Sequence, residues 1–204
     1  MTLVKICGIT RLEDALDAAA LGASAIGLVF WPASPRAVDP ISARAIVEAL
    51  PPLVTPVGVF VDQPEAEVDR IAGEVRLGAV QLHGHETPEY CGRMRRPVIK
   101  AFGVDRSFDE AVMDPYPAGV TVLLDARDDQ KRGGTGRQID WTLAARVAAK
   151  RRIMLAGGVD AGNVEDAIRT VRPFAIDVSS GVERAPGVKD HAKMQALFEA
   201  VKRC

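Results

Sequence analysis

The sequence alternates short apolar runs with segments of helical periodicity, and this alternation limits the fold more than any other feature. Eight runs are rich in valine, isoleucine or leucine and are bounded by glycine, proline or a charged residue, as buried parallel strands are. These runs occupy residues 3–7, 25–30, 54–61, 78–82, 97–102, 120–125, 152–156 and 174–178. The segments between them predict helices over residues 40–50, 64–73, 87–95, 107–113, 140–150 and 162–171.

Eight strand–helix units predict an α/β fold, a (β/α)8 TIM barrel in which residues 1–204 form a single domain. A doubly wound open sheet is the alternative architecture. That fold usually has a glycine-rich turn after its first strand, whereas the residues here are Cys7, Gly8, Ile9 and Thr10. The barrel is therefore the predicted fold.

Two further helices are predicted from their side chains. Thr10 and Glu13 have the spacing of a capping box, which predicts a helix that begins at Thr10. Its apolar face is expected to consist of Leu12, Ala15, Leu16 and Ala19. The last helix is expected to bury Met194, Leu197, Phe198 and Val201.

Composition excludes several classes of protein. The chain has 204 residues, of which 48% are hydrophobic and 26% charged, the balance of a soluble globular protein. A formal net charge of −1 favours neither nucleic acid nor an acidic membrane surface as a partner. The N-terminus leaves no room for a signal peptide, and no apolar run approaches the roughly 20 residues that span a bilayer. The cysteines, Cys7, Cys91 and Cys204, are too few and too widely spaced for a disulfide framework, which suits the cytoplasm.

The polar residues of the strands share one face. Alternate residues of a barrel strand face the lumen, and this parity places Lys5 with Cys7, and Gln81 with His83, opposite the purely apolar positions. Barrel active sites lie at the C-terminal ends of the strands. We therefore expect four residues to line one shared site: Cys7, His83, Asp125 and Asp177.

Two loops have the composition of a phosphate site. The loops after the seventh and eighth strands of such barrels often bind phosphate together with a short extra helix. Gly157 and Gly158 allow a close approach of the backbone to an anion, and Ser179, Ser180 and Gly181 offer hydroxyl and amide donors. These five residues are the predicted phosphate ligands.

Two other loops are candidates for substrate contact. Residues 125–137 are charged and glycine-rich, and they are predicted to form either a mobile lid or a solvated loop. Residues 31–38 contain Arg36, which could bind a carboxylate through two N–H groups or be an ordinary surface residue.

Several of these motifs together resemble one enzyme family. "KICGIT", "SPRAV", "QLHG", "LLDA", "GGTGRQIDW", "LAGGV" and "DVSSGVE" occur in the order found in the phosphoribosylanthranilate isomerases of tryptophan biosynthesis, over residues 4 to about 190. The resemblance implies a (β/α)8 barrel and an Amadori rearrangement of N-(5-phosphoribosyl)anthranilate. It implies no metal or organic cofactor, and either a monomer or a homodimer.

The resemblance also implies roles for individual residues. Cys7, in the "KICG" motif, would be the general base, and Asp125, in "LLDA", the general acid. Arg36 would lie near the anthranilate carboxylate, and the "GG" and "SSG" loops would hold the phosphate. Asp125 can act only when protonated, and burial in a lumen favours the protonated form of a carboxyl group.

Cys7 can also be interpreted as a small buried hydrophobe, the commoner situation for a cysteine. Thiolate is the active form, and a free thiol is mostly protonated at neutral pH. Lys5 lies on the same strand face as Cys7, and we expect its charge to alter the pKa of the thiol.

Four alternatives remain open at this point. Another phosphosugar isomerase would pair Asp125 with Asp177, and a lyase would use Lys5 or Lys100 as a Schiff-base nucleophile. A metal enzyme would use His83, His85 and Glu86 as ligands. A non-catalytic barrel would bind phosphoribosyl ligands without turnover.

Overall fold

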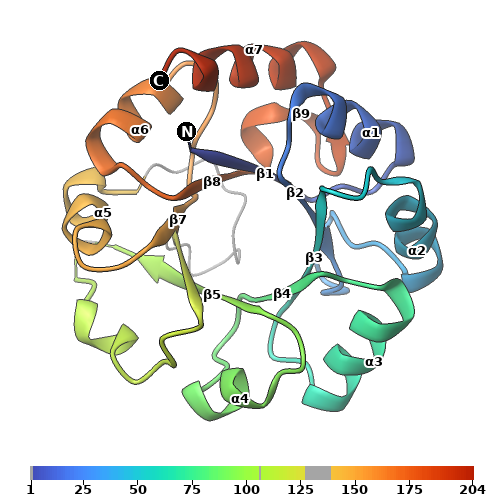
Figure 1. Cartoon of the computed structure of the whole chain (residues 1–204), viewed down its shortest axis with the longest axis horizontal. Helices are drawn as coiled ribbons and strands as arrows, with labels where there is room; N and C mark the ends of the chain where they lie inside the picture. The colour runs from blue at the N-terminus through green and yellow to red at the C-terminus, as the bar shows by residue number, and fades with distance from the viewer. Residues whose placement is uncertain (1, 106, 127–138) are drawn as a thin grey trace.

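The strands form a closed parallel barrel in the computed structural model, which describes residues 2–105, 107–126 and 139–204. Each strand pairs with the next along the chain, and the last pairs with the first. The predicted barrel is thus confirmed, and Figure 1 shows it surrounded by helices. The strands are β1 (Leu3–Cys7), β2 (Ala25–Val29), β3 (Thr55–Phe60), β4 (Ala79–Leu82), β5 (Val98–Val104), β6 (Thr121–Ala126), β7 (Ile153–Leu155) and β8 (Ala175–Val178).

Most predicted helices are present within one to three residues of the expected bounds. They are α1 (Leu12–Leu21), α2 (Pro40–Ala49), α3 (Glu65–Val75), α4 (Pro88–Arg93), α5 (Trp141–Ala148), α6 (Val164–Val171) and α7 (His191–Lys202). The exception is the helix expected over 107–113, where only the short 3-10 helix η1 (Glu110–Met113) forms. Pro115 and Pro117 follow at once, and proline supplies no N–H to extend a helix.

The predicted start of the first helix is wrong. Arg11 is the N-cap of α1 without a side-chain bond, and the Thr10 hydroxyl instead donates to the carbonyl of Gly187. Leu12 and Leu16, expected to be buried, are 42% and 40% exposed. The buried face consists instead of Asp14, Ala15 and Ala18.

A small hairpin explains why Asp14, and not Leu12 or Leu16, lies on the buried side of α1. After β8 the chain forms the 3-10 helix η2 (Ser180–Val182) and two antiparallel strands, β9 (Glu183–Ala185) and β10 (Val188–Lys189). Asp14 accepts a hydrogen bond from the backbone N–H of Lys189 at 3.0 Å. The buried side of α1 is therefore fixed by a hairpin more than 160 residues later, and no local periodicity predicts it.

The last helix and the strand parity follow the prediction. Met194, Leu197, Phe198 and Val201 of α7 are buried. The outward-facing residues of β1, β4 and β8, among them Val4 and Ile6, pack against the helices. A separate cluster fills the lumen. The lumen cluster consists of Val57, Ala79, Ile99, Ala101, Leu123, Met154, Ala156 and Ala175.

No helix in the described part of the chain is long and apolar enough to cross a membrane. Cys7, Cys91 and Cys204 are all free thiols. The cytoplasmic location and the single-domain organisation stay predictions.

Candidate functional site

Polar side chains from four strands form one connected chain across the lumen. Lys5 on β1 donates from Nζ to Asp177 Oδ1 on β8 at 2.9 Å and to Gln81 Oε1 on β4 at 2.8 Å. Gln81 Nε2 lies 3.1 Å from His83 Nδ1, and His83 Nε2 lies 3.4 Å from Asp125 Oδ2 at the end of β6. The structure therefore brings His83, Asp125 and Asp177 together.

Cys7 lies beside this chain at the C-terminal end of β1. Gly27 on the neighbouring strand leaves room for it, because a Cβ at residue 27 would be 2.6 Å from Cys7 Sγ and 3.1 Å from Lys5 Nζ. Burial raises the pKa of the Cys7 thiol, while the charge of Lys5 opposes that shift. Burial also disfavours the charge of Lys5, but Asp177 and Cys7 outweigh it and raise the pKa of Lys5.

A buried triad of charges lies behind Cys7. Lys189 Nζ donates to the Cys7 carbonyl at 2.6 Å, to the Ser179 carbonyl at 3.2 Å and to Glu183 Oε1 at 2.9 Å. Glu183 also binds Arg36 through two bonds, at 2.9 Å from Nε and 2.7 Å from Nη2. Lys189 thus ties the end of β1 to the loop after β8, and Arg36 is held in a fixed orientation.

The ionisation of this triad follows from its contacts. Burial lowers the pKa of Lys189, although Glu183 opposes the shift. Burial raises the pKa of Glu183, but Arg36 and Lys189 outweigh it and bring the net pKa below its ordinary value. Hydrogen bonds to Glu183 raise the pKa of Arg36. Glu183 and Arg36 are therefore charged at neutral pH.

The two predicted phosphate loops lie next to each other and next to Asp125. Gly157 has a φ of +81°, and a Cβ there would be 2.7 Å from the Ala126 amide nitrogen. A Cβ on Gly181 would collide with the carbonyl of Val159, so both loops depend on glycine for their close approach. Gly158 is held through its carbonyl, which accepts from Asn163 Nδ2 at 2.7 Å.

The serines of the second loop are partly exposed. Ser179 precedes η2, and Ser180 is its first residue. This is the short extra helix expected after the eighth strand.

Comparison with known proteins identifies the family. The family model described as "N-(5'phosphoribosyl)anthranilate (PRA) isomerase" matches residues 4–200. A protein of that name from Pelobacter propionicus is 48% identical over 204 residues, 99% of this chain and 96% of its own. The chain belongs to the phosphoribosylanthranilate isomerase family.

Solved structures of this isomerase family have the same fold. The enzyme from Thermus thermophilus superposes with a TM-score of 0.90 at 46% identity, covering 99% of both chains. A second family structure, in complex with reduced 1-(o-carboxyphenylamino)-1-deoxyribulose 5-phosphate, has a TM-score of 0.88 at 42% identity over the full length of both chains. The present chain is thus an isomerase with the family's barrel.

The hypothesis of a metal enzyme finds no support, because the described residues hold no group of three side chains suited to a metal ion. His83 contacts Gln81 and Asp125, whereas Glu86 is paired with Lys100 at 3.0 Å. His85 is 80% exposed and lies 3.4 Å from an oxygen of Asp62.

Neither lysine of the lyase interpretation is placed as a nucleophile in the isomerase barrel. Lys100 points away from the lumen and donates to Glu86 and to the carbonyls of Leu82, Gly84 and Ala101. Lys5 is charged and bound to Asp177 and Gln81. A Schiff-base nucleophile must be a neutral amine, which the raised pKa of Lys5 disfavours.

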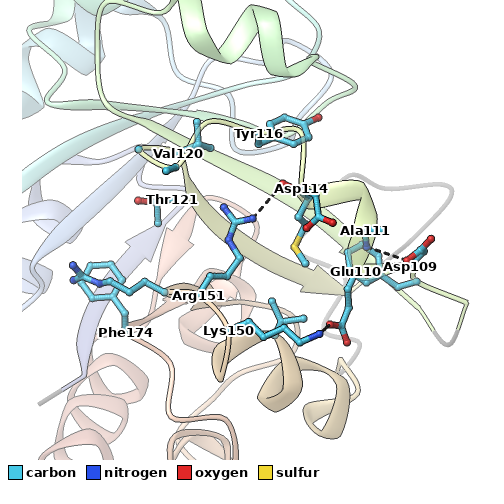
Figure 2. Close-up of a pocket in the computed structure, with 16 residues that line it drawn as sticks. Asp109, Glu110, Ala111, Asp114, Tyr116, Val120, Thr121, Lys150, Arg151 and Phe174 are labelled. Atoms are coloured by element: carbon cyan, nitrogen blue, oxygen red, sulfur yellow. Dashed lines mark hydrogen bonds and ion pairs between the residues drawn. The ribbon is translucent and has the colours of Figure 1, made fainter.

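A broad cavity of about 1270 Å³, shown in Figure 2, lies elsewhere on the isomerase. It is lined by η1, by the residues after α5 and by those that lead into β6 and β8. In Figure 2 Lys150 points to Glu110, and Arg151 is bonded to the carbonyl of Met113 at 3.2 Å. η1 lies between β5 and β6, and Lys150, Arg151 and Phe174 precede β7 and β8. The cavity is therefore outside the barrel wall, away from the lumen that holds Cys7 and Asp125, and is not the candidate site.

Three residues of the isomerase site were not among the sequence-based candidates. Gln81 could have been found, because it is a polar residue on the lumenal face of an apolar strand. Glu183 closes the motif "DVSSGVE", but the resemblance gave it no role, and the hairpin that brings it to Lys189 was not predicted. The lid proposed for 125–137 falls almost wholly on residues 127–138, outside the described part of the chain.

Proposed function

We propose that the chain converts N-(5'-phosphoribosyl)anthranilate to 1-(o-carboxyphenylamino)-1-deoxyribulose 5-phosphate, a step of tryptophan biosynthesis. Family membership over nearly the whole chain supports this substrate. So does the relative of equal length that is solved with the reduced product. The observation that carries the mechanism is the lumenal chain from Lys5, beside Cys7, to Asp125.

Asp125 is the proposed general acid. The ribofuranosylamine ring opens when the bond between its oxygen and the anomeric carbon breaks, and the oxygen then needs a proton. The Asp125 side chain is 10% exposed, and its Oδ1 accepts a bond from the Ala126 amide at 2.8 Å. This contact fixes the carboxyl group, so that the protonated acid can deliver its proton to the ring oxygen.

Cys7 is the proposed general base. Ring opening leaves a protonated imine, which acidifies the hydrogen on the neighbouring carbon. The Cys7 thiolate removes that proton, and the electron pair of the C–H bond forms the enolamine, which tautomerises to the ketone. Lys5 favours the thiolate because it places a positive charge beside it.

The remaining predicted residues are proposed to hold the substrate. Two of the five N–H groups of Arg36 bind Glu183, and the other three suit the anthranilate carboxylate. The backbone at Gly157 and Gly158, and the donors of Ser179, Ser180 and Gly181, suit the phosphate. His83 and Asp177 would line the ribose. Whether the working form is a monomer or a homodimer stays a prediction.

The test is turnover of N-(5'-phosphoribosyl)anthranilate by the wild-type chain, followed through the loss of anthranilate-type fluorescence. We expect saturable turnover without added metal or cofactor. Binding of the substrate without turnover would instead favour the non-catalytic barrel. Absence of both binding and turnover would contradict the proposed substrate.

Lys5→Met should move the pH profile of kcat/KM. Loss of the positive charge raises the pKa of the Cys7 thiol further, because burial and Asp177 raise it and only Lys189 is left to oppose them. A base works when deprotonated, so the rising limb of the profile shifts to higher pH and activity at neutral pH falls. The measurement is kcat/KM across the rising limb, with the melting temperature as a check on folding.

Asp177→Asn should shift the pH profile of kcat/KM in the opposite direction. The negative charge of Asp177 raises the pKa of the thiol, so its removal should move the same limb to lower pH. Shifts of opposite direction in the two variants would assign the limb to Cys7. An unchanged profile in Lys5→Met would show that Lys5 does not tune the base.

A further inference from the structure

The hydrogen bonds that link Asp177, Lys5, Gln81 and His83 allow only one assignment of donors and acceptors. A lysine ammonium carries donors and no acceptor, so the atom of Gln81 that faces Lys5 at 2.8 Å is the carbonyl oxygen. The amide nitrogen of Gln81 then faces His83 Nδ1 at 3.1 Å. Turning the amide over would oppose its NH2 group to the ammonium. The orientation of Gln81 is therefore set by Lys5.

The same logic continues into the imidazole ring. The Gln81 amide nitrogen only donates, so His83 Nδ1 must accept and cannot carry a proton. In a neutral ring with an unprotonated Nδ1, the proton is on Nε2. Nε2 is the atom that lies 3.4 Å from Asp125 Oδ2.

We propose that Gln81 is a positioning residue that holds His83 as the neutral Nε2–H tautomer, with the protonated nitrogen 3.4 Å from Asp125 Oδ2. Its catalytic meaning rests on the proposed role of Asp125 as the acid. The tautomer itself follows from the donors and acceptors of Lys5 and Gln81 and does not depend on that role.

Burial makes the arrangement strict. Lys5 and Gln81 are each 1% exposed, so a water molecule cannot readily replace either partner. Glutamine carries an acceptor oxygen and a donor nitrogen on the same neutral group, and both atoms are used here. Glutamate has nearly the same shape but lacks the N–H donor. With glutamate at residue 81, His83 Nδ1 would therefore have to carry a proton and donate it.

The tautomer has a consequence for the proposed acid. An imidazolium next to a carboxyl group favours the ionised carboxylate, which has no proton to give to the ring oxygen. By excluding a proton from Nδ1, Gln81 keeps the ring neutral. A neutral N–H at this distance from Asp125 does not draw off its proton.

The first test is made on the wild-type protein. A two-bond ¹H–¹⁵N correlation spectrum distinguishes protonated from unprotonated ring nitrogens. The chain has three histidines, so His85→Asn and His191→Asn suffice to assign the signals of His83. We expect Nε2 of His83 to carry the proton and Nδ1 to be bare at neutral pH. A protonated Nδ1, in either the other tautomer or the imidazolium, would overturn the proposal.

The second test is Gln81→Glu. The carboxylate offers only acceptors, so Nδ1 of His83 should become protonated, and kcat should fall by about tenfold or more, since a wrong tautomer is costly in related acid–base sites. Gln195→Glu is the matched control, because Gln195 is exposed on α7 and bonded only to Glu199 among the described residues. It makes the same charge change and should leave both the spectrum and kcat unchanged.

Gln81→Met covers the case in which Gln81→Glu does not fold. Methionine fills the space without either hydrogen bond, so the preference of His83 should be lost and both ring nitrogens should show partial protonation. A ring that stays in the Nε2–H form in this variant would contradict the proposal. An Asp125→Asn variant with unchanged turnover would remove the proposed acid, while the spectra would still decide the tautomer.

Discussion

Asp125→Asn should lower kcat/KM for N-(5'-phosphoribosyl)anthranilate by about 10²–10⁴-fold, the usual contribution of a general acid. Asparagine preserves the shape of the side chain and can still accept from the Ala126 amide through Oδ1. It has no proton that it can give to the ring oxygen. The expected loss corresponds to about 3–5 kcal/mol of the activation barrier.

The matched control is Asp166→Asn. Asp166 is 69% exposed on α6 and paired with Arg169. This variant should keep wild-type turnover, which shows that loss of one carboxylate is harmless outside the site. Turnover of Asp125→Asn within a few-fold of wild type would move the acid to another residue.

Cys7→Ser should lower kcat/KM by a similar factor, about 10²–10⁴-fold. A hydroxyl group is far less acidic than a thiol, so serine cannot supply an anionic base at neutral pH. The small size and polarity of serine suit the space beside Gly27 and Lys5, so folding should be preserved. The measurement is steady-state turnover together with the melting temperature.

Cys204→Ser is the matched control for this variant. Cys204 is exposed at the C-terminus, and the one hydrogen bond of its thiol among the described residues is to the Ala200 carbonyl, at 3.6 Å. Full activity is expected. Turnover that survives in Cys7→Ser would assign the proton abstraction to another group, and it would leave Cys7 as a packing residue of the barrel.

Much of the barrel could be predicted from local patterns. The period of two along a strand placed Lys5, Cys7, Gln81, His83 and Asp125 on the lumenal face, because successive side chains of any strand point to opposite sides. The same kind of pattern failed for α1, where Leu12 and Leu16 have helical spacing but are exposed. There the side chain of Asp14 binds the backbone of a distant hairpin, and a tertiary contact outweighs local periodicity.

The sequence by itself determined the fold class and the strand faces, including the lumenal position of Cys7 and Asp125, since these depend on local spacing along the chain. Only the tertiary structure decided that Lys5 bonds Gln81, 76 residues away, and Asp177, 172 residues away. It likewise decided that Glu183 holds Arg36. These contacts depend on the register and closure of the barrel, which come from pairing across the whole chain and leave no local signal in the sequence.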